Sequence, residues 1–169
     1  MDINRIYGLL NRKTAIKPKS YDIAALNSLA EFLRHPDIAD YLRHCLPQEV
    51  VGVSGVRLLP LEAIEGEMAE GAAPGSFIRP YGYLVVATSV GGNAICFHSP
   101  SGRVFWVNHE SFNTKSITFQ DRATGQWKYL YEYSPENVQK ALVPLSDNIE
   151  NFLSDLLTDK LEARLDPLD

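Results

Sequence analysis

The most regular hydrophobic pattern in the chain lies at residues 81–110, where three apolar runs are separated by two groups of turn-forming residues. The runs are rich in β-branched and aromatic residues, which favour strands. The separators are Gly91-Gly92-Asn93 and Ser99-Pro100-Ser101-Gly102, which favour turns. The pattern predicts three consecutive strands that organise the rest of the chain, at 81–89, 93–98 and 103–109.

The pairing of these strands predicts where their side chains lie. Regular closure of the second turn pairs Phe97 with Val104 and Ile95 with Trp106, so that these four share one face of the sheet. Both faces are then apolar, which predicts interior strands covered on both sides, with Phe97 and Trp106 in the core. The opposite face carries Ala94, Cys96, Phe105 and Val107.

Helix and hairpin patterns precede this meander. Apolar residues repeat at helical spacing from residue 20 or 21 to His35-Pro36, and the residue before a proline avoids helical geometry. Asp37 is the expected N-cap of a second short helix, and we expect both helices to cover one face of the sheet. The apolar runs at 50–53 and 56–59 predict a hairpin.

After the meander, residues 113–134 predict further strands. Ser134-Pro135 predicts the start of a helix that Pro144 stops. Asp147, followed three residues later by Glu150, is typical of a capping box and predicts a last helix with a broad apolar face. The whole pattern predicts an α+β fold, with a mixed or antiparallel sheet of about five to seven strands and helices from both ends of the chain packed on it.

These motifs, taken together, resemble the SUKH superfamily, which includes fungal cell-wall regulators and many bacterial immunity proteins. The similarity rests on the strand ending in Gly91-Gly92-Asn93, the polar glycine turn, and the run Val-Phe-Trp-Val-Asn-His-Glu that follows it. An upstream element, Leu59-Pro60-Leu61, and the closing helix at 149–157 frame them. Asn93 stands where an Asp is more usual. The resemblance implies an α+β fold and a non-catalytic role, in immunity proteins the neutralisation of a cognate toxin, often a nuclease, by direct binding.

Composition restricts the class of partner. A chain of 169 residues with 45% hydrophobic and 22% charged residues suits one globular domain over 1–169. Its formal charge of −5 favours a basic protein partner over nucleic acid. The apolar runs predict neither a membrane span nor a signal peptide, and two cysteines do not form a disulfide framework. We therefore expect a cytoplasmic protein.

Charge is distributed unevenly between the two ends of the chain. Residues 1–20 carry five basic and one acidic side chain, a net of +4, and predict a basic N-terminal extension. Residues 145–169 carry seven acidic and two basic side chains, a net of −5, with a frayed acidic end at 159–169 marked by Asp166-Pro167. The simpler interpretation is two solvated surfaces, and the alternative is that the two ends attract each other.

Two segments are candidates for binding a partner. Residues 62–76 mix carboxylates with Gly, Ala and Pro, and predict a long acidic loop without counter-charges that suits a basic protein. Residues 126–133 place alternate aromatic side chains on one face of a strand. We expect that face to pack against the last helix, but if exposed it becomes a binding surface, because aromatics dominate interface hot spots. The candidate partner-binding residues are Glu62, Glu65, Glu67, Glu70, Trp127 and Tyr129.

Candidate catalytic and metal-binding residues are few. Cys96, His98 and Glu110 suggest a nucleophile, base and orienter, but alternate residues of a strand lie ~6–7 Å apart, beyond hydrogen-bond reach. His98 and His109 are separated by about 20 Å in the predicted register, too far to share one ion. The sequence therefore favours a binding protein without a catalytic residue, metal or cofactor. The alternatives are a regulatory interaction module and a small enzyme with a site near Cys96 and His98, and the oligomeric state stays open.

Overall fold

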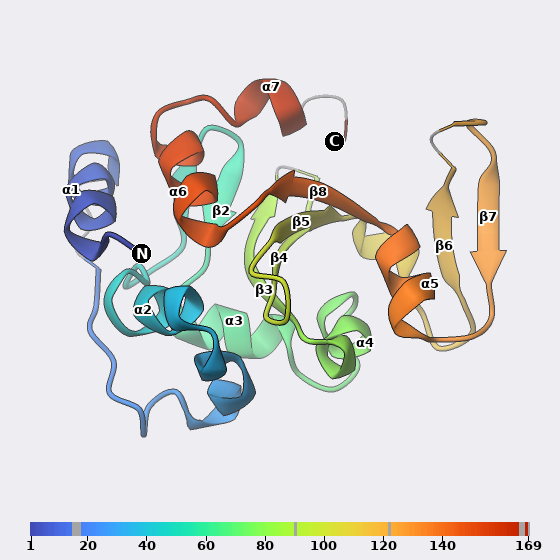
Figure 1. Cartoon of the computed structure of the whole chain (residues 1–169), viewed down its shortest axis with the longest axis horizontal. Coiled ribbons are helices and arrows are strands. Elements are labelled where there is room, and N and C mark those ends of the chain that lie inside the picture. Colours follow the sequence, from blue (N-terminus) through green and yellow to red (C-terminus); the bar gives the residue numbers. More distant parts are fainter. Residues whose placement is uncertain (15–17, 90, 122, 166–167, 169) are drawn as a thin grey trace.

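The computed structural model describes residues 1–169 except 15–17, 90, 122, 166, 167 and 169. It has an α+β architecture in which helices pack on a six-stranded antiparallel sheet, with a separate two-stranded sheet at one end (Figure 1). The strand order in the main sheet is β1-β2-β3-β4-β5-β8. This confirms the predicted fold class. The strands of the main sheet are β1 (Val51–Val53), β2 (Val56–Leu58), β3 (Tyr83–Ser89), β4 (Ala94–His98), β5 (Val104–Val107) and β8 (Leu142–Ser146).

The predicted meander forms β3, β4 and β5, three interior strands of the sheet. Phe97 pairs with Val104 and Ile95 with Trp106, as the turn chemistry predicted. Every residue of β3 and β5 is buried, and β4 is buried except for the half-buried His98 at its end. The register and the two-sided burial are therefore confirmed. The register follows from the four-residue turn between β4 and β5, and the two-sided burial follows from apolar residues on both faces of the strands.

Strand β8 was not predicted. Pro144 indicated the end of a helix, but the helix after Ser134 already ends at Lys140, and Pro144 lies within β8. As the last strand in the order, β8 has a neighbour on one side only, and an edge position tolerates a proline because one side of the strand needs no hydrogen-bond donor. The hairpin of β1 and β2 was predicted correctly, with its turn at Ser54-Gly55.

The N-terminal segment is helical rather than an extension. Helix α1 (Ile3–Thr14) buries Ile6 and Leu10 and lies beside α6 (Figure 1). The next segment is a 3-10 helix, η1 (Asn27–Arg34), instead of a helix beginning at residue 20 or 21. Its buried positions Leu26, Leu29 and Phe32 recur every three residues, the period of a 3-10 helix, whereas Ile23 is exposed.

Helix capping differs in detail from the prediction. Helix α2 (Pro36–His44) has His35 as its N-cap and Pro36 at its first position, so the assignment of Asp37 is wrong by two residues. Asn148 rather than Asp147 caps the last long helix, because its side chain accepts a hydrogen bond from the Asn151 amide at 2.8 Å. Ser134 caps as predicted. Helix α5 (Pro135–Lys140) directly precedes β8, and helices α6 (Ile149–Leu157) and α7 (Glu162–Leu165) follow it.

The predicted acidic loop is largely helical. Helix α3 begins directly after Pro60 and buries Leu61 and Ile64, and the Met68 sulfur that follows it lies 3.3 Å from the Val85 amide of β3. The pairing of β3 with β4 shifts in register between Val85 and Ala87, so the sulfur accepts from an amide beside a bulge in the strand ladder. The elements of this region are α3 (Leu61–Glu67), α4 (Gly75–Ile78), η2 (Arg79–Tyr81) and, after β5, η3 (His109–Ser111).

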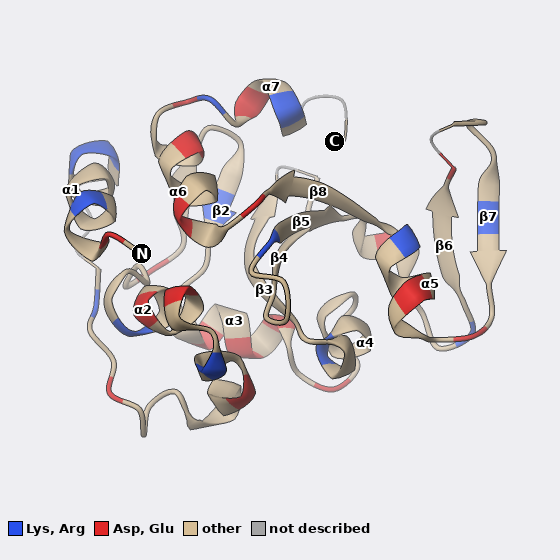
Figure 2. Cartoon of the chain, viewed as in Figure 1, with Lys and Arg blue, Asp and Glu red and all other residues tan. Residues whose placement is uncertain are grey.

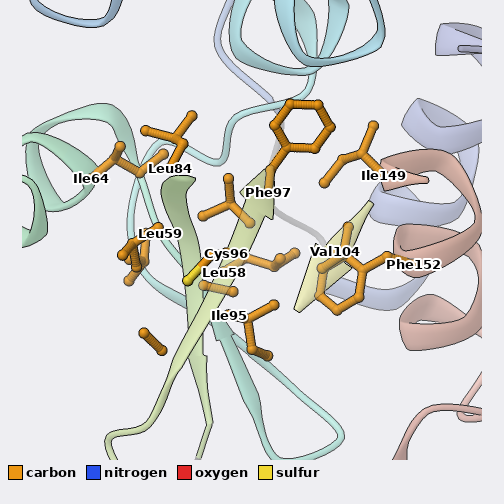
Figure 3. Close-up of a cluster of buried hydrophobic side chains, with 14 of the residues drawn as sticks. Leu58, Leu59, Ile64, Leu84, Ile95, Cys96, Phe97, Val104, Ile149 and Phe152 are labelled. Atoms are coloured by element: carbon orange, nitrogen blue, oxygen red, sulfur yellow. The ribbon is translucent and has the colours of Figure 1, made fainter. Parts of the chain in front are cut away.

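The core lies between the meander and the helices from the two ends of the chain. Figure 3 shows Phe97 and Val104 on the side of the sheet that faces α6, close to Ile149 and Phe152. The ring of His35 meets Phe97 edge-on, with centroids 5.0 Å apart. Helices from both chain ends therefore cover this face, as predicted.

The two chain ends attract each other. Arg5 pairs with Glu150 at 3.4 Å and Lys13 with Asp159 at 2.5 Å, which joins α1 to α6 and the residues after it (Figure 2). These pairs are partly exposed to solvent, where ion pairs contribute little, so buried Ile6 and Leu10 carry most of the packing. The interpretation of two separate solvated surfaces is wrong.

The C-terminal segment is ordered further than predicted. Leu161 and Leu165 are buried around α7, which contradicts fraying over this stretch, whereas Asp166-Pro167 lies outside the described residues. Arg164 of α7 donates to the Leu145 carbonyl of β8 at 2.9 Å, which fixes α7 against the sheet edge. In the described ranges, no helix combines the length and apolarity needed to cross a membrane.

Candidate functional site

The second sheet is a hairpin that stands at the end of the molecule, beyond α5 (Figure 1). We call it the aromatic arm, and it consists of β6 (Ile117–Gln120) and β7 (Trp127–Leu130). Trp127 pairs with Gln120 and Tyr129 with Thr118, and directly paired residues share a face of the hairpin. The other face carries Ile117, which is fully buried. The arm is therefore fixed to the body through one face and presents its two aromatic side chains on the other.

The aromatic face is exposed. The exposed fraction is 57% for Trp127 and 59% for Tyr129, so the expected packing of this face against the last helix is wrong. The predicted row of four aromatics also ends with the strand at Leu130. Tyr131 is exposed, and Tyr133 turns back to donate a hydrogen bond to the Asn113 carbonyl at 2.7 Å. The aromatic face therefore does not pack against the last helix but is exposed, the alternative that makes it a candidate binding surface.

Two adjoining hollows flank Trp127. The smaller hollow, of about 260 Å³, lies over the aromatic face, and the larger, of about 650 Å³, lies between the arm and the edge strand β8. Both contain Trp127, Asn108 and Ser111. The smaller hollow is also lined by Glu110, Thr118 and Tyr129, and the larger by residues that include Trp106, Gln120, Asp121 and 140–144.

The charged side chains around these hollows favour a cation. Asp121 accepts hydrogen bonds from the amides of Thr124 and Ala123 at 3.1 and 3.0 Å, which hold the pKa of its carboxyl below the usual value and keep it ionised. Glu110 is mostly exposed, and its nearest recorded ionic neighbour is the imidazole of His109 at 3.9 Å. Lys140, a basic residue of the larger hollow, already pairs with Glu136 at 2.9 Å.

The four glutamates predicted as a docking loop are in different environments. Ser28 donates a short hydrogen bond to Glu65. Glu67 is half-buried, and burial raises the pKa of its carboxyl while nearby Arg57 partly opposes this shift. Glu62 and Glu70 are exposed. The prediction that all four are unpartnered on a mobile loop is therefore wrong, and of the four only Glu62 and Glu70 are exposed as expected.

The alternative catalytic site at Cys96 and His98 lacks the required chemistry. Cys96 is fully buried, and this burial raises the pKa of its thiol far above the ordinary value, which disfavours the nucleophilic thiolate. Burial also lowers the pKa of His98, whose ring stacks on Tyr83 at 4.2 Å and contacts the Ser101 hydroxyl at 2.8 Å. The pair does not provide an activated nucleophile and a base.

The histidines also lie apart. His98 ends β4, whereas the ring of His109 contacts the side chain of Asn93, just before β4 begins, at 3.1 Å. They therefore lie near opposite ends of one strand, as the register predicted. Across the described portion of the chain, no group of three or more His, Cys, Asp or Glu side chains is placed to hold a metal ion.

The aromatic face of the arm is the strongest candidate site, because it combines exposed aromatic area, concavity and negative charge. The sequence identified Trp127 and Tyr129 as candidates but missed Asn108 and Ser111, which only the fold brings to the arm. The signal in the sequence was the Asn-His-Glu-Ser segment after β5, where four polar residues follow a buried strand. No protein-family model, curated protein or solved structure matches this chain.

Proposed function

We propose that this chain is a non-catalytic protein-binding module and that the aromatic arm is its binding surface. The observation that carries the proposal is the exposure of Trp127 and Tyr129, each more than half accessible, on an arm whose opposite face is anchored by buried Ile117. Trp and Tyr are enriched among the residues that dominate binding energy, since they bury a large area while immobilising few rotatable bonds.

The construction of the arm supports a role outside the folding of this domain. An isolated two-stranded hairpin is marginally stable in water, so one face of this arm must pack on the body. That requirement is met by Ile117 and by the half-buried Phe119 and Leu130. The two aromatic side chains of the other face are more than half exposed, and a partner that covers them would bury a large apolar area.

The specific form of the proposal is an immunity protein that binds and neutralises a cognate basic toxin in the cytosol of the cell that makes both. Three features support it: the resemblance of the meander to SUKH proteins, the formal charge of −5, and the carboxylates of Glu110 and Asp121 beside the aromatic pair. A basic partner would be drawn to such a surface, because complementary charge raises the rate of encounter.

We expect the double variant Trp127→Ala/Tyr129→Ala to bind the partner about 30-fold more weakly or worse, the loss expected when hot-spot residues are removed. The partner to be tested is the product of the reading frame next to this gene. Calorimetry measures the affinity, and protection of growth on co-expression measures neutralisation. Tyr131→Ala is the matched control, because Tyr131 is an exposed aromatic residue outside both hollows.

The double variant should keep the unfolding temperature of the parent, because it alters only exposed side chains. Unchanged affinity in a folded double variant would contradict the proposed surface. Binding without protection of growth would support a protein-binding module but would contradict the immunity role.

The two exposed glutamates make a smaller, kinetic prediction. We expect Glu62→Gln/Glu70→Gln to lower the association rate about 2–5-fold at low salt and to leave the dissociation rate unchanged, because exposed charges act mainly on encounter. The difference should shrink as salt rises, since charges are screened beyond ~8 Å at physiological ionic strength. Glu65→Gln is the comparison, because Glu65 already accepts a hydrogen bond from Ser28. Equal association rates for parent and double variant across the salt series would show that these two carboxylates do not contribute to the encounter with the partner.

A further inference from the structure

We infer that the smaller hollow of the aromatic arm receives the guanidinium group of an arginine on the partner. This assignment rests on the proposed function and specifies the chemistry that the surface recognises. It follows from the placement of two aromatic side chains and one carboxylate around a single small hollow, lined by Trp127, Tyr129 and Glu110.

The size and walls of the hollow fit a planar cation. Trp127 and Tyr129 come from alternate positions of β7, so their rings stand on the same face of the arm. A guanidinium stacks on such rings through cation–π attraction, to which Trp contributes most. A volume of about 260 Å³ is too small for a folded element of a partner but is sufficient for one side chain.

The polar groups of the hollow are acceptors suited to the same cation. Glu110 and Thr118, whose side chains carry acceptor oxygens, are among its lining residues, and a guanidinium offers five N–H donors in a rigid plane. The Asn108 side chain accepts from the Glu110 amide at 2.8 Å, which fixes the start of η3 and therefore the position of Glu110 beside the aromatic pair. Among the residues of the described ranges that line this hollow, none is basic.

The larger hollow next to it suggests a different recognition mode, in which an extended segment of the partner would add to the free edge of β8. Two features oppose that mode. Pro144 lacks an amide hydrogen within β8, and the Leu145 carbonyl already accepts from Arg164 at 2.9 Å. An edge interrupted in this way offers few backbone groups to a new strand, so side-chain recognition at the arm is favoured.

The test uses the whole chain and two small probes, N-acetyl-L-arginine methylamide and the matched citrulline compound, which has nearly the same shape but no charge. The chain has two tryptophans, and their indole N–H signals in a ¹H–¹⁵N spectrum are assigned with Trp127→Phe. Trp106 lines only the larger hollow, so its signal reports whether a probe enters that hollow instead. We expect a saturable shift of the Trp127 signal, with binding of the arginine probe at least about fivefold tighter than that of the citrulline probe.

Variants separate the contributions of ring and carboxylate. Glu110→Gln should weaken the arginine probe by about 2–5-fold and leave the citrulline probe unchanged. Glu132→Gln is the matched control, since Glu132 is an exposed carboxylate outside both hollows. The arginine probe should also shift the backbone amide signal of Tyr129, and Trp127→Ala should abolish that shift.

Equal binding of the two probes, or no response of the Trp127 signal, would overturn the assignment of a guanidinium to this hollow. Equal binding of the corresponding lysine probe would also overturn it, because a planar group was inferred. The proposed function would survive either result if Trp127→Ala/Tyr129→Ala still weakened the partner. Loss of that effect, with arginine binding intact, would instead contradict the proposed function alone.

Discussion

Replacing Phe97 by alanine should lower the free energy of unfolding by ~3–5 kcal/mol, the usual cost of truncating a buried aromatic side chain. Phe97 is fully buried at the centre of the meander, between its strand neighbours and the helices of both chain ends (Figure 3). Its ring contacts the His35 edge on one side and lies near Ile149 of α6 on the other. The resulting cavity has walls from three parts of the chain, so it cannot collapse through the movement of one element.

Urea denaturation followed by circular dichroism measures this loss, and such a loss is a large fraction of the ~5–15 kcal/mol that stabilises a domain. Ile23→Ala is the control, because Ile23 is an exposed aliphatic residue and its truncation should change stability by less than ~0.5 kcal/mol. A loss under 1 kcal/mol for Phe97→Ala would show that the core is not centred on this strand.

A second large effect is expected from one methyl group at Gly75. A Cβ at this position would lie 1.9 Å from the Glu67 carbonyl oxygen and 2.8 Å from the Glu67 carbonyl carbon, so α4 would have to move away from the end of α3. The obstacle is backbone and not the end of a flexible side chain. Gly75→Ala should therefore destabilise the protein by about 1–3 kcal/mol, the range for overpacked sites, and should lie in its upper half.

Gly66→Ala is the matched control, nine residues earlier in the same acidic segment. Gly66 is an exposed residue of α3, and a Cβ at this position would have no neighbouring atom of the described residues within 4 Å. Alanine there should stabilise the protein by up to ~1 kcal/mol, because glycine is a poor helix former. Thermal unfolding of both variants distinguishes the effects by sign. Stabilisation by Gly75→Ala, or similar losses at both sites, would contradict the close approach of α3 and α4.

The arm and the acidic segment illustrate how far the candidate site could be predicted. The alternation of aromatics at 126–133 correctly indicated a strand and named Trp127 and Tyr129. It could not indicate which face packs on the body, because both faces carry apolar residues. The face that packs is the one with Leu130, because its partner on the neighbouring strand, Ile117, is buried. In the acidic segment, glycine and proline indicated a loop, yet the buried Leu61 and Ile64 stabilise a helix through contacts with the sheet, which override local propensity.

The sequence by itself determined the meander: its strands, its turns, the pairing of Phe97 with Val104, and the burial of both faces. The turns and the pairing depend on residues close in the sequence. Apolar residues on both faces of the strands predict burial of both, although the side chains that cover them come from distant parts of the chain. Tertiary structure alone decided the docking of α1 on α6, the addition of β8 at the sheet edge, and the exposure of the arm. Each of these depends on surfaces from distant parts of the chain, whose burial stabilises a segment that its own residues do not specify.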